Sequence, residues 1–161
     1  MQLNLKTIIN FKEKYPKFKM TDSRFVEKDD VKIIQFRLEP KNKSKGICSL
    51  CDQPHPCYDH LKERSFKHID LWGIATEYVY RMRRVSCPEH GIIVEKVPWS
   101  DGKSPLTLSC AWYLSEWVKL LSIEEVARRF KDQTPNPIIF QLFYPSFNFS
   151  LLLKELEIYY Q

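Results

Sequence analysis

Two cysteine-containing motifs in this sequence have the spacing of metal ligands. Cys48-Ser49-Leu50-Cys51 and Cys87-Pro88-Glu89-His90 each place two ligand side chains three positions apart. Zinc takes four sulfur or nitrogen ligands in a tetrahedron, and one tight turn can present two of them together. Such a turn tends to need a positive φ just after its second ligand, and Asp52 and Gly91 are residue types that tolerate one. The motifs predict one structural Zn²⁺ per chain, held by Cys48, Cys51, Cys87 and His90.

Other assignments of these cysteines remain open. Cys57 is the main rival ligand because Cys48, Cys51 and Cys57 could share one loop, and three further histidines are nearby: His55, His60 and His68. The simplest alternative is that the cysteines are reduced and buried as small apolar side chains, a role that also suits Cys110. If the four predicted ligands bind, no coordination position stays open for water or substrate, which disfavours catalysis at the metal.

Composition narrows the class of protein further. The chain has 161 residues, of which 43% are apolar and 14% aromatic, so it can form a hydrophobic core. Its net charge of +5 permits contact with nucleic acid. Neither of the two common glycine-rich nucleotide-binding motifs occurs. The first 18 residues lack the apolar segment of a secretory signal, and the 5 cysteines are an odd number. We therefore expect a reducing, cytoplasmic location and a metal site in place of disulfides.

The elements expected to position the motifs belong to an α+β fold. A short helix is predicted over residues 2–14, and strands over 31–38, 66–72, 76–85 and 92–97, with Gly73 separating the second and third strands. Ser104-Pro105 resembles a helix start, followed by a helix through Leu121. Ser122 and Glu125 have capping-box spacing, which predicts a second helix as far as Lys131.

We expect four segments along the chain. Residues 1–40 form an N-terminal helix and strand, 41–101 a small zinc-ribbon-like β module, 102–133 a helical segment, and 134–161 a divergent apolar tail. The tail carries no charge from Gln133 to Leu153, but its prolines and polar residues disfavour a membrane-spanning helix. A frameshifted or foreign C-terminus is the preferred explanation of the tail.

A string of further motifs carries a resemblance to a known family. These are Tyr58-Asp59, Arg64-x-Phe66, Asp70-Leu71-Trp72-Gly73, Tyr80-Arg81-Met82-Arg83-Arg84-Val85, Cys87-Pro88-Glu89-His90-Gly91 and Glu95-x-Val97-Pro98-Trp99-x-Asp101-Gly102. Together with Cys48-x-x-Cys51, they make residues 1–132 resemble the N-terminal region of bacterial insertion-sequence transposases of the IS L-three group. Members of that family carry a zinc finger, then a helix-turn-helix, then a DDE-type catalytic domain.

The resemblance implies binding to the double-stranded DNA of transposon ends, with residues 122–131 similar to the first helix of the helix-turn-helix. The sequence departs from the family at 133–137, where the expected turn is absent, and no catalytic domain is recognisable after it. We therefore expect a truncated relative, nucleoid-associated when bound to DNA, that has no catalysis and no small-molecule substrate. Self-association, pairing with an intact transposase that it inhibits, and a decayed gene remnant are the alternatives.

Seven cations are the expected DNA contacts of this chain: Arg64, Lys67, Arg81, Arg83, Arg84, Arg128 and Arg129. Each of them could equally lie on a solvated face, and the last two could act only as charges at a helix end. The basic loop 41–45 is expected to be merely flexible and polar. The four tryptophans, Trp72, Trp99, Trp112 and Trp117, are expected in the core, with stacking on unpaired bases as the alternative.

Overall fold

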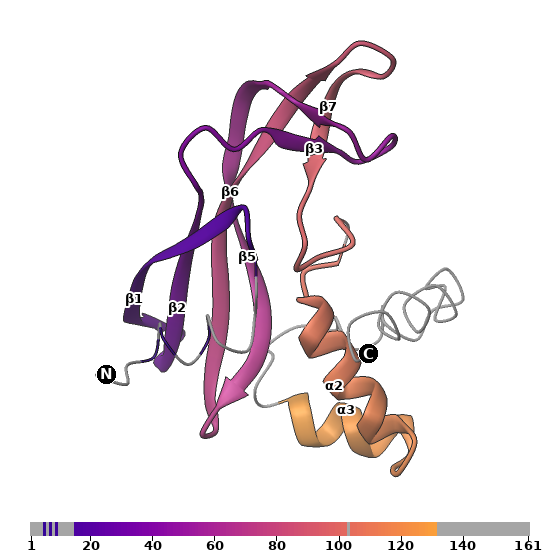
Figure 1. The fold of residues 1–161 in the computed structure, drawn as a ribbon. Helices are drawn as coiled ribbons and strands as arrows, with labels where there is room; N and C mark the ends of the chain where they lie inside the picture. Colours follow the sequence, from indigo (N-terminus) through magenta and orange to yellow (C-terminus); the bar gives the residue numbers. More distant parts are fainter. Residues whose placement is uncertain (1–4, 6, 8, 10–14, 103, 132–161) are drawn as a thin grey trace. The chain divides into compact units, whose positions relative to one another are not determined.

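The computed structural model describes residues 5, 7, 9, 15–102 and 104–131, and it confirms a mixed α+β fold, in which strands dominate (Figure 1). The described elements are β1 (Phe18–Lys28), β2 (Val31–Pro40), β3 (Gly46–Cys48), β4 (Pro54–His55), β5 (Cys57–Leu71), β6 (Ile74–Cys87), β7 (Gly91–Lys96), α2 (Leu108–Val118) and α3 (Ile123–Lys131). The chain divides into two compact units, 1–113 and 114–161, and α2 crosses the boundary between them.

Strand β6 organises the sheet of the first unit. The strand order is β1-β2-β6-β7-β3-β4, with β5 paired to the remaining edge of β6. The first half of β6 pairs in parallel with β2, from Ile34↔Thr76 to Arg37↔Val79. Its last four residues pair with β7. One continuous strand, rich in β-branched and aromatic residues, thus joins the core of the sheet to the cysteine motifs.

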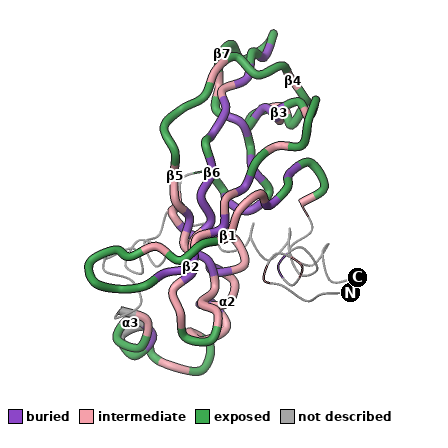
Figure 2. Tube along the Cα trace, turned by 90° about the vertical axis from the view of Figure 1, so that its left-hand side faces the viewer, coloured by how far each residue is buried: buried purple, intermediate pink, exposed green. Residues whose placement is uncertain are grey.

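Trp99 lies at the centre of an aromatic core in this unit. Its ring centroid is 4.8 Å from that of Phe18, 5.1 Å from that of Tyr80 and 5.4 Å from that of Tyr15. Two of these ring pairs are T-shaped, an arrangement that adds to the free energy gained by burial. Figure 2 shows the buried positions along β6 and the exposed loop between β1 and β2. The predicted core position of Trp99, which is 1% exposed, is confirmed.

Trp72 contradicts the prediction that all four tryptophans are core residues. It is 78% exposed in the turn between β5 and β6, where Trp72 and Gly73 have φ values of 53° and 79°. Positive φ at both central residues is the signature of the two-residue turn that matches strand twist. A side chain on such a turn projects into solvent whatever its polarity. Trp112 and Trp117 are half-buried.

The strand predictions are largely confirmed, but β1 and the two short strands β3 and β4 are absent from them. Strands β2 and β6 cover their predicted segments, and β5 and β7 cover theirs except for the last residues, Trp72 and Val97; β5 also begins nine residues earlier than predicted, at Cys57 in place of Phe66. Strand β1 was not predicted because charged residues interrupt it, and only Phe18 and Met20 of its side chains are buried. Of the helix predicted over 2–14, the structure describes Leu5, Thr7 and Ile9, which are helical; its other positions lie outside the described residues.

The predicted start of the first C-terminal helix is wrong. Helix α2 begins at Leu108, and its N-cap is Thr107, whose hydroxyl accepts a hydrogen bond from the Cys110 N–H at 3.2 Å. The Ser104 hydroxyl instead accepts the Leu106 N–H at 3.0 Å, a local turn that precedes the helix. A tertiary contact fixes Thr107 as the cap in place of Ser104, because the Thr107 N–H donates to the Lys67 carbonyl of β5 at 2.9 Å.

The predicted start of the second helix, in the other unit, is confirmed. The Ser122 hydroxyl accepts the Glu125 N–H at 3.2 Å, and the Glu125 carboxylate accepts the Ser122 N–H at the same distance. The hydrogen bond from the Ser122 backbone lowers the pKa of Glu125. The predicted apolar tail, 134–161, lies outside the described residues. Among the described helices, none has the length and apolarity that crossing a membrane requires.

Candidate metal centre

The first ligand pair lies on a tight turn between β3 and β4. The Asp52 N–H donates to the Cys48 carbonyl at 3.1 Å, and the Cys48 N–H donates to the Gln53 carbonyl at 2.9 Å. These two bonds close the turn around Cys51. Asp52 has a φ of 57°, as predicted for the residue after the second ligand.

The second ligand pair lies on the turn between β6 and β7. Cys87 ends β6, His90 follows within the turn, and Gly91 begins β7 with a φ of 70°, again as predicted. Strand β3 pairs with β7 through Ile47↔Lys96 and Cys48↔Glu95. This short antiparallel pairing brings the two turns together, as the upper part of Figure 1 shows.

The ligand atoms of the two pairs converge to the spacing of a tetrahedral site. Those of Cys48, Cys51, Cys87 and His90 all lie within 4.8 Å of one another. The Cys51 and Cys87 sulfurs are 3.7 Å apart, and His90 Nδ1 lies 3.4 Å from the Cys87 sulfur and 3.8 Å from that of Cys48. Zinc bond lengths of about 2.3 Å to sulfur and about 2.0 Å to nitrogen give separations of about 3.8 Å and 3.6 Å in a tetrahedron. The group can therefore hold a metal ion.

The electrostatics of the group also favour a cation. Backbone N–H groups of Cys51 and Leu50 hydrogen-bond the Cys48 sulfur and lower the pKa of its thiol to about 7. The Gln53 N–H acts in the same direction on Cys51, but burial and the neighbouring sulfurs of Cys48 and Cys87 raise its pKa to about 11. Crowded sulfurs cannot all ionise next to one another without a positive charge between them, and a metal ion supplies that charge.

The rival ligands lie outside this group. The exposed Cys57 thiol points to the Asp59 carbonyl, 3.4 Å away, and His60 is exposed. His68 is buried, with Nδ1 2.9 Å from the Thr107 hydroxyl and Nε2 3.2 Å from the Tyr78 hydroxyl. His55 Nε2 lies 3.8 Å from the Cys51 sulfur, beside the group but not part of it.

Cys110 occupies the core position expected for it. Its side chain is buried, and burial raises the pKa of the thiol to about 12. Among the described residues, Cys110 does not belong to the group of metal-ligating side chains.

A buried ion pair next to the metal centre was not expected from the sequence. The Arg83 guanidinium donates to the Glu95 carboxylate, with Nη2–Oε2 and Nε–Oε2 distances of 2.7 and 2.9 Å, and both side chains are at most 5% exposed. Tyr80 donates its hydroxyl to the same carboxylate at 2.6 Å. Arg83 Nη1 also donates to the carbonyl of Ser44 at 2.9 Å. The pair thus connects β6, β7 and the loop that leads into β3.

The other expected DNA-contacting residues have varied surroundings. Arg64 donates to the carbonyls of Gly102 and Ser104 at 2.6 and 2.8 Å, and Lys67 forms an ion pair with Asp70 at 3.0 Å. Arg84 forms an ion pair with Asp59 and holds the pKa of that carboxyl below its usual value. Arg81 is exposed and donates through Nε to the Leu61 carbonyl at 3.2 Å.

In the second unit, Arg128 and Arg129 are exposed, and Arg129 lies 5.3 Å from the ring centroid of Trp117.

Comparison with known proteins gives no match: no family model, curated protein or solved structure matches this chain. The metal centre and its surroundings therefore carry the functional argument.

Proposed function

We propose that this chain is a zinc-stabilised DNA-binding module that acts like the N-terminal region of insertion-sequence transposases and recognises transposon-end DNA. The observation that carries the proposal is the convergence of three cysteines and one histidine from two separate turns. Three sulfurs and one nitrogen at tetrahedral spacing favour Zn²⁺ among the common metals. In this proposal the metal is structural, and the β3–β4 and β6–β7 turns form a zinc-ribbon-like module.

The charges of the described residues support DNA as the partner. The whole chain has a net charge of +5, and Arg81, Arg128 and Arg129 are exposed cations. Helix α3 has the capped start of a helix-turn-helix first helix, so we propose that it docks next to the DNA backbone. The part assigned to this chain is DNA binding, without strand transfer.

Zinc content and salt-dependent DNA binding together test the proposal. The purified chain should contain one zinc per molecule and bind a duplex with an affinity that falls linearly with the logarithm of salt concentration. Cys51→Ser should lose both properties, whereas Cys57→Ser, which removes a thiol outside the ligand group, should keep them. A chain that contains no zinc, or binds duplex DNA no better than a charge-matched control protein does, would refute the proposal.

Pairing with another transposase chain is the second candidate function, and the exposure of Trp72 favours it. Trp72 is 78% exposed on its turn, and tryptophan is among the residue types enriched at the energetic centres of protein interfaces. Trp72→Ser should then weaken co-purification with an intact transposase in the absence of DNA. Leu120→Ser is the matched control, because Leu120 is equally exposed, at 78%. Equal recovery of the partner by both variants would exclude Trp72 as an anchor.

A further inference from the structure

Five exposed lysines on two adjoining segments differ from most of the cations expected to bind DNA. They are Lys17, Lys19, Lys41, Lys43 and Lys45, which we call the lysine surface. Arg64, Lys67, Arg83 and Arg84 are each engaged with a carbonyl or a carboxylate of the chain. Among the described residues, no carboxylate lies within ion-pairing distance of any lysine of the lysine surface. Their ammonium groups are therefore available to an external anion.

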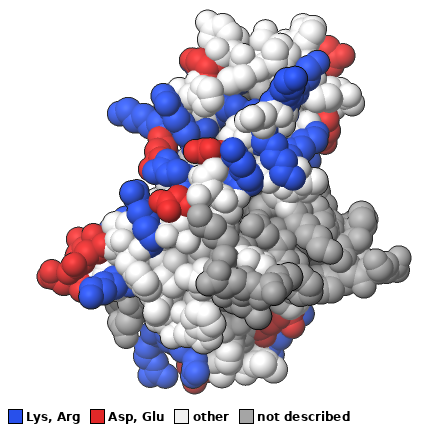
Figure 3. Space-filling model, turned by 60° about the vertical axis from the view of Figure 1, so that its left-hand side comes forward, with Lys and Arg blue, Asp and Glu red and all other residues white. Residues whose placement is uncertain are grey.

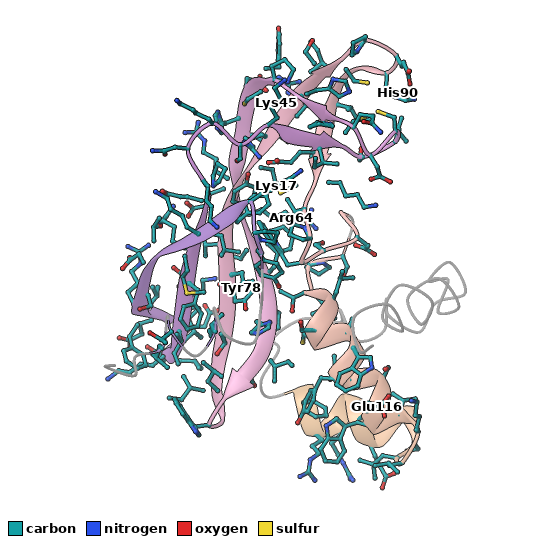
Figure 4. The ribbon with its side chains drawn as sticks, in the orientation of Figure 1. Lys17, Lys45, Arg64, Tyr78, His90 and Glu116 are labelled. Atoms are coloured by element: carbon teal, nitrogen blue, oxygen red, sulfur yellow. The ribbon has the colours of Figure 1, made fainter. Side chains whose placement is uncertain are left out.

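Backbone hydrogen bonds hold the two segments of the lysine surface together. The Lys41 N–H donates to the Lys17 carbonyl at 2.8 Å, which fixes the start of the loop against the start of β1. The Ser44 N–H donates to the Lys41 carbonyl at 3.0 Å and closes a turn. The buried Arg83 binds the Ser44 carbonyl and fixes the end of the loop. Figure 4 labels Lys17 and Lys45 at the two ends of this arrangement, with Lys45 nearer to His90.

The two segments of the lysine surface carry little acidic charge of their own. Within residues 17–19 and 39–45 the single acidic residue is Glu39, which lies opposite Lys19 in the β1–β2 pairing. Figure 3 shows Lys and Arg side chains gathered on the upper part of one face, with acidic side chains interspersed among them. The positive potential there is suited to a polyanion.

Lys43 has a backbone conformation that does not favour lysine. Its φ is 63°, and it is the third residue of the turn closed by Ser44 and Lys41, a position that glycine occupies with the least strain. A lysine at this position adds a charge to the lysine surface at the expense of backbone strain. Strained residues of this kind concentrate at binding sites.

We propose that the lysine surface binds the phosphate backbone of double-stranded DNA, an inference that rests on the proposed function. The only aromatic residue in its two segments is Phe18, which is buried in the core. Single-stranded nucleic acids are bound through aromatic side chains that stack on bases, and this surface has none to offer. Lysines without base-stacking partners suit phosphates, which position a duplex without reading its sequence.

Matched charge removals test this inference. Lys43→Gln/Lys45→Gln removes two charges from the lysine surface, and Arg24→Gln/Lys32→Gln removes two from exposed positions elsewhere on the β1–β2 hairpin. The first variant should weaken duplex binding at least tenfold in about 0.1 M salt, and its slope of log affinity against log salt should be less negative by about 2. The control should change both quantities much less. Zinc content and thermal unfolding of each variant check that the fold is retained.

Lys43→Gly separates binding from folding. Glycine removes the strain at φ 63°, so the midpoint of thermal unfolding should stay the same or rise while duplex affinity falls. If the wild-type chain binds duplex DNA but Lys43→Gln/Lys45→Gln behaves like its control, the inference is wrong and the proposed function stands. If the wild-type chain does not bind duplex DNA, the proposed function itself fails. Binding of a single strand at least as tightly as the duplex also overturns the assignment.

Discussion

Removing the metal should unfold the two metal-binding turns and leave the aromatic core folded. Within the described part of the chain, the buried apolar cluster at the candidate metal centre consists of Cys48, Val85 and Cys87, with Cys51 and Ile93 partly buried against it. The main core around Trp99 is a separate cluster that includes Phe18, Phe36 and Tyr78. With the proposed metal bound, we therefore expect the turns to depend on it and the sheet core to be independent of it.

An approximate free-energy sum supports this expectation. The turns and short strands 46–55 and 87–91 are about 15 residues, and ordering them costs about 15 kcal/mol at about 1 kcal/mol each. The buried side chains there contribute about 5 kcal/mol. A structural zinc contributes about 10 kcal/mol or more at neutral pH, which offsets the part of the ordering cost that burial does not. Without the metal, the turns should be unfolded.

Amide hydrogen exchange with and without a chelator measures the effect. Chelation should abolish protection in 46–55 and 87–91 and leave that of Tyr78 and its neighbours in β6 unchanged. Cys51→Ser without chelator should reproduce the result, and Cys57→Ser should match the wild type. Unchanged protection of the turns after verified removal of the metal would refute the reasoning, as would loss of protection throughout β6.

Two substitutions test the packing around the candidate site, and a third tests the cap of α3. Glu95→Gln leaves the buried Arg83 charge without its carboxylate and should cost about 3–5 kcal/mol of unfolding free energy, measured with urea. Gly46→Ala places a methyl group 2.5 Å from a side-chain carbon of β6 and should cost about 1–3 kcal/mol in the same assay. Ser122→Ala removes the cap of α3 and should destabilise this helix by about 1 kcal/mol. The loss should be seen as lower helicity by circular dichroism. Unchanged helicity would exclude the capping box as a stabilising feature.

The metal ligands could be predicted from the sequence because local rules decide their placement. A three-residue spacing and a residue tolerant of positive φ suffice to build each turn, and Asp52 and Gly91 have that conformation. The capping box of Ser122 was predictable for the same reason. What the spacing could not establish is that β3 would pair with β7 and bring the two turns together.

The burial and the ion-pair partners of the charged residues could not be predicted, because both depend on contacts between strands that are distant in sequence. Arg83 and Arg84 are adjacent in sequence, but one is buried against Glu95 and the other is half-exposed and bound to Asp59. Alternation along a strand indicates that their faces differ, but it does not identify their partners. The hydrogen bonds that hold the loop 41–45 to Lys17 and Arg83 are also long-range, so the local sequence of the loop does not reveal them.

Arg83 gives the metal centre and the lysine surface a common support. Its guanidinium binds Glu95, the residue that pairs with Cys48 between β7 and β3, and also the carbonyl of Ser44 in the basic loop. The loop is followed directly by Gly46, whose ideal Cβ position lies only 3.2 Å from a Glu95 oxygen. Since ordering of β3 depends on the metal, the loop that precedes it should lose its fixed end when the metal is removed. Metal binding and DNA binding should therefore be coupled, although no lysine of the surface is a metal ligand.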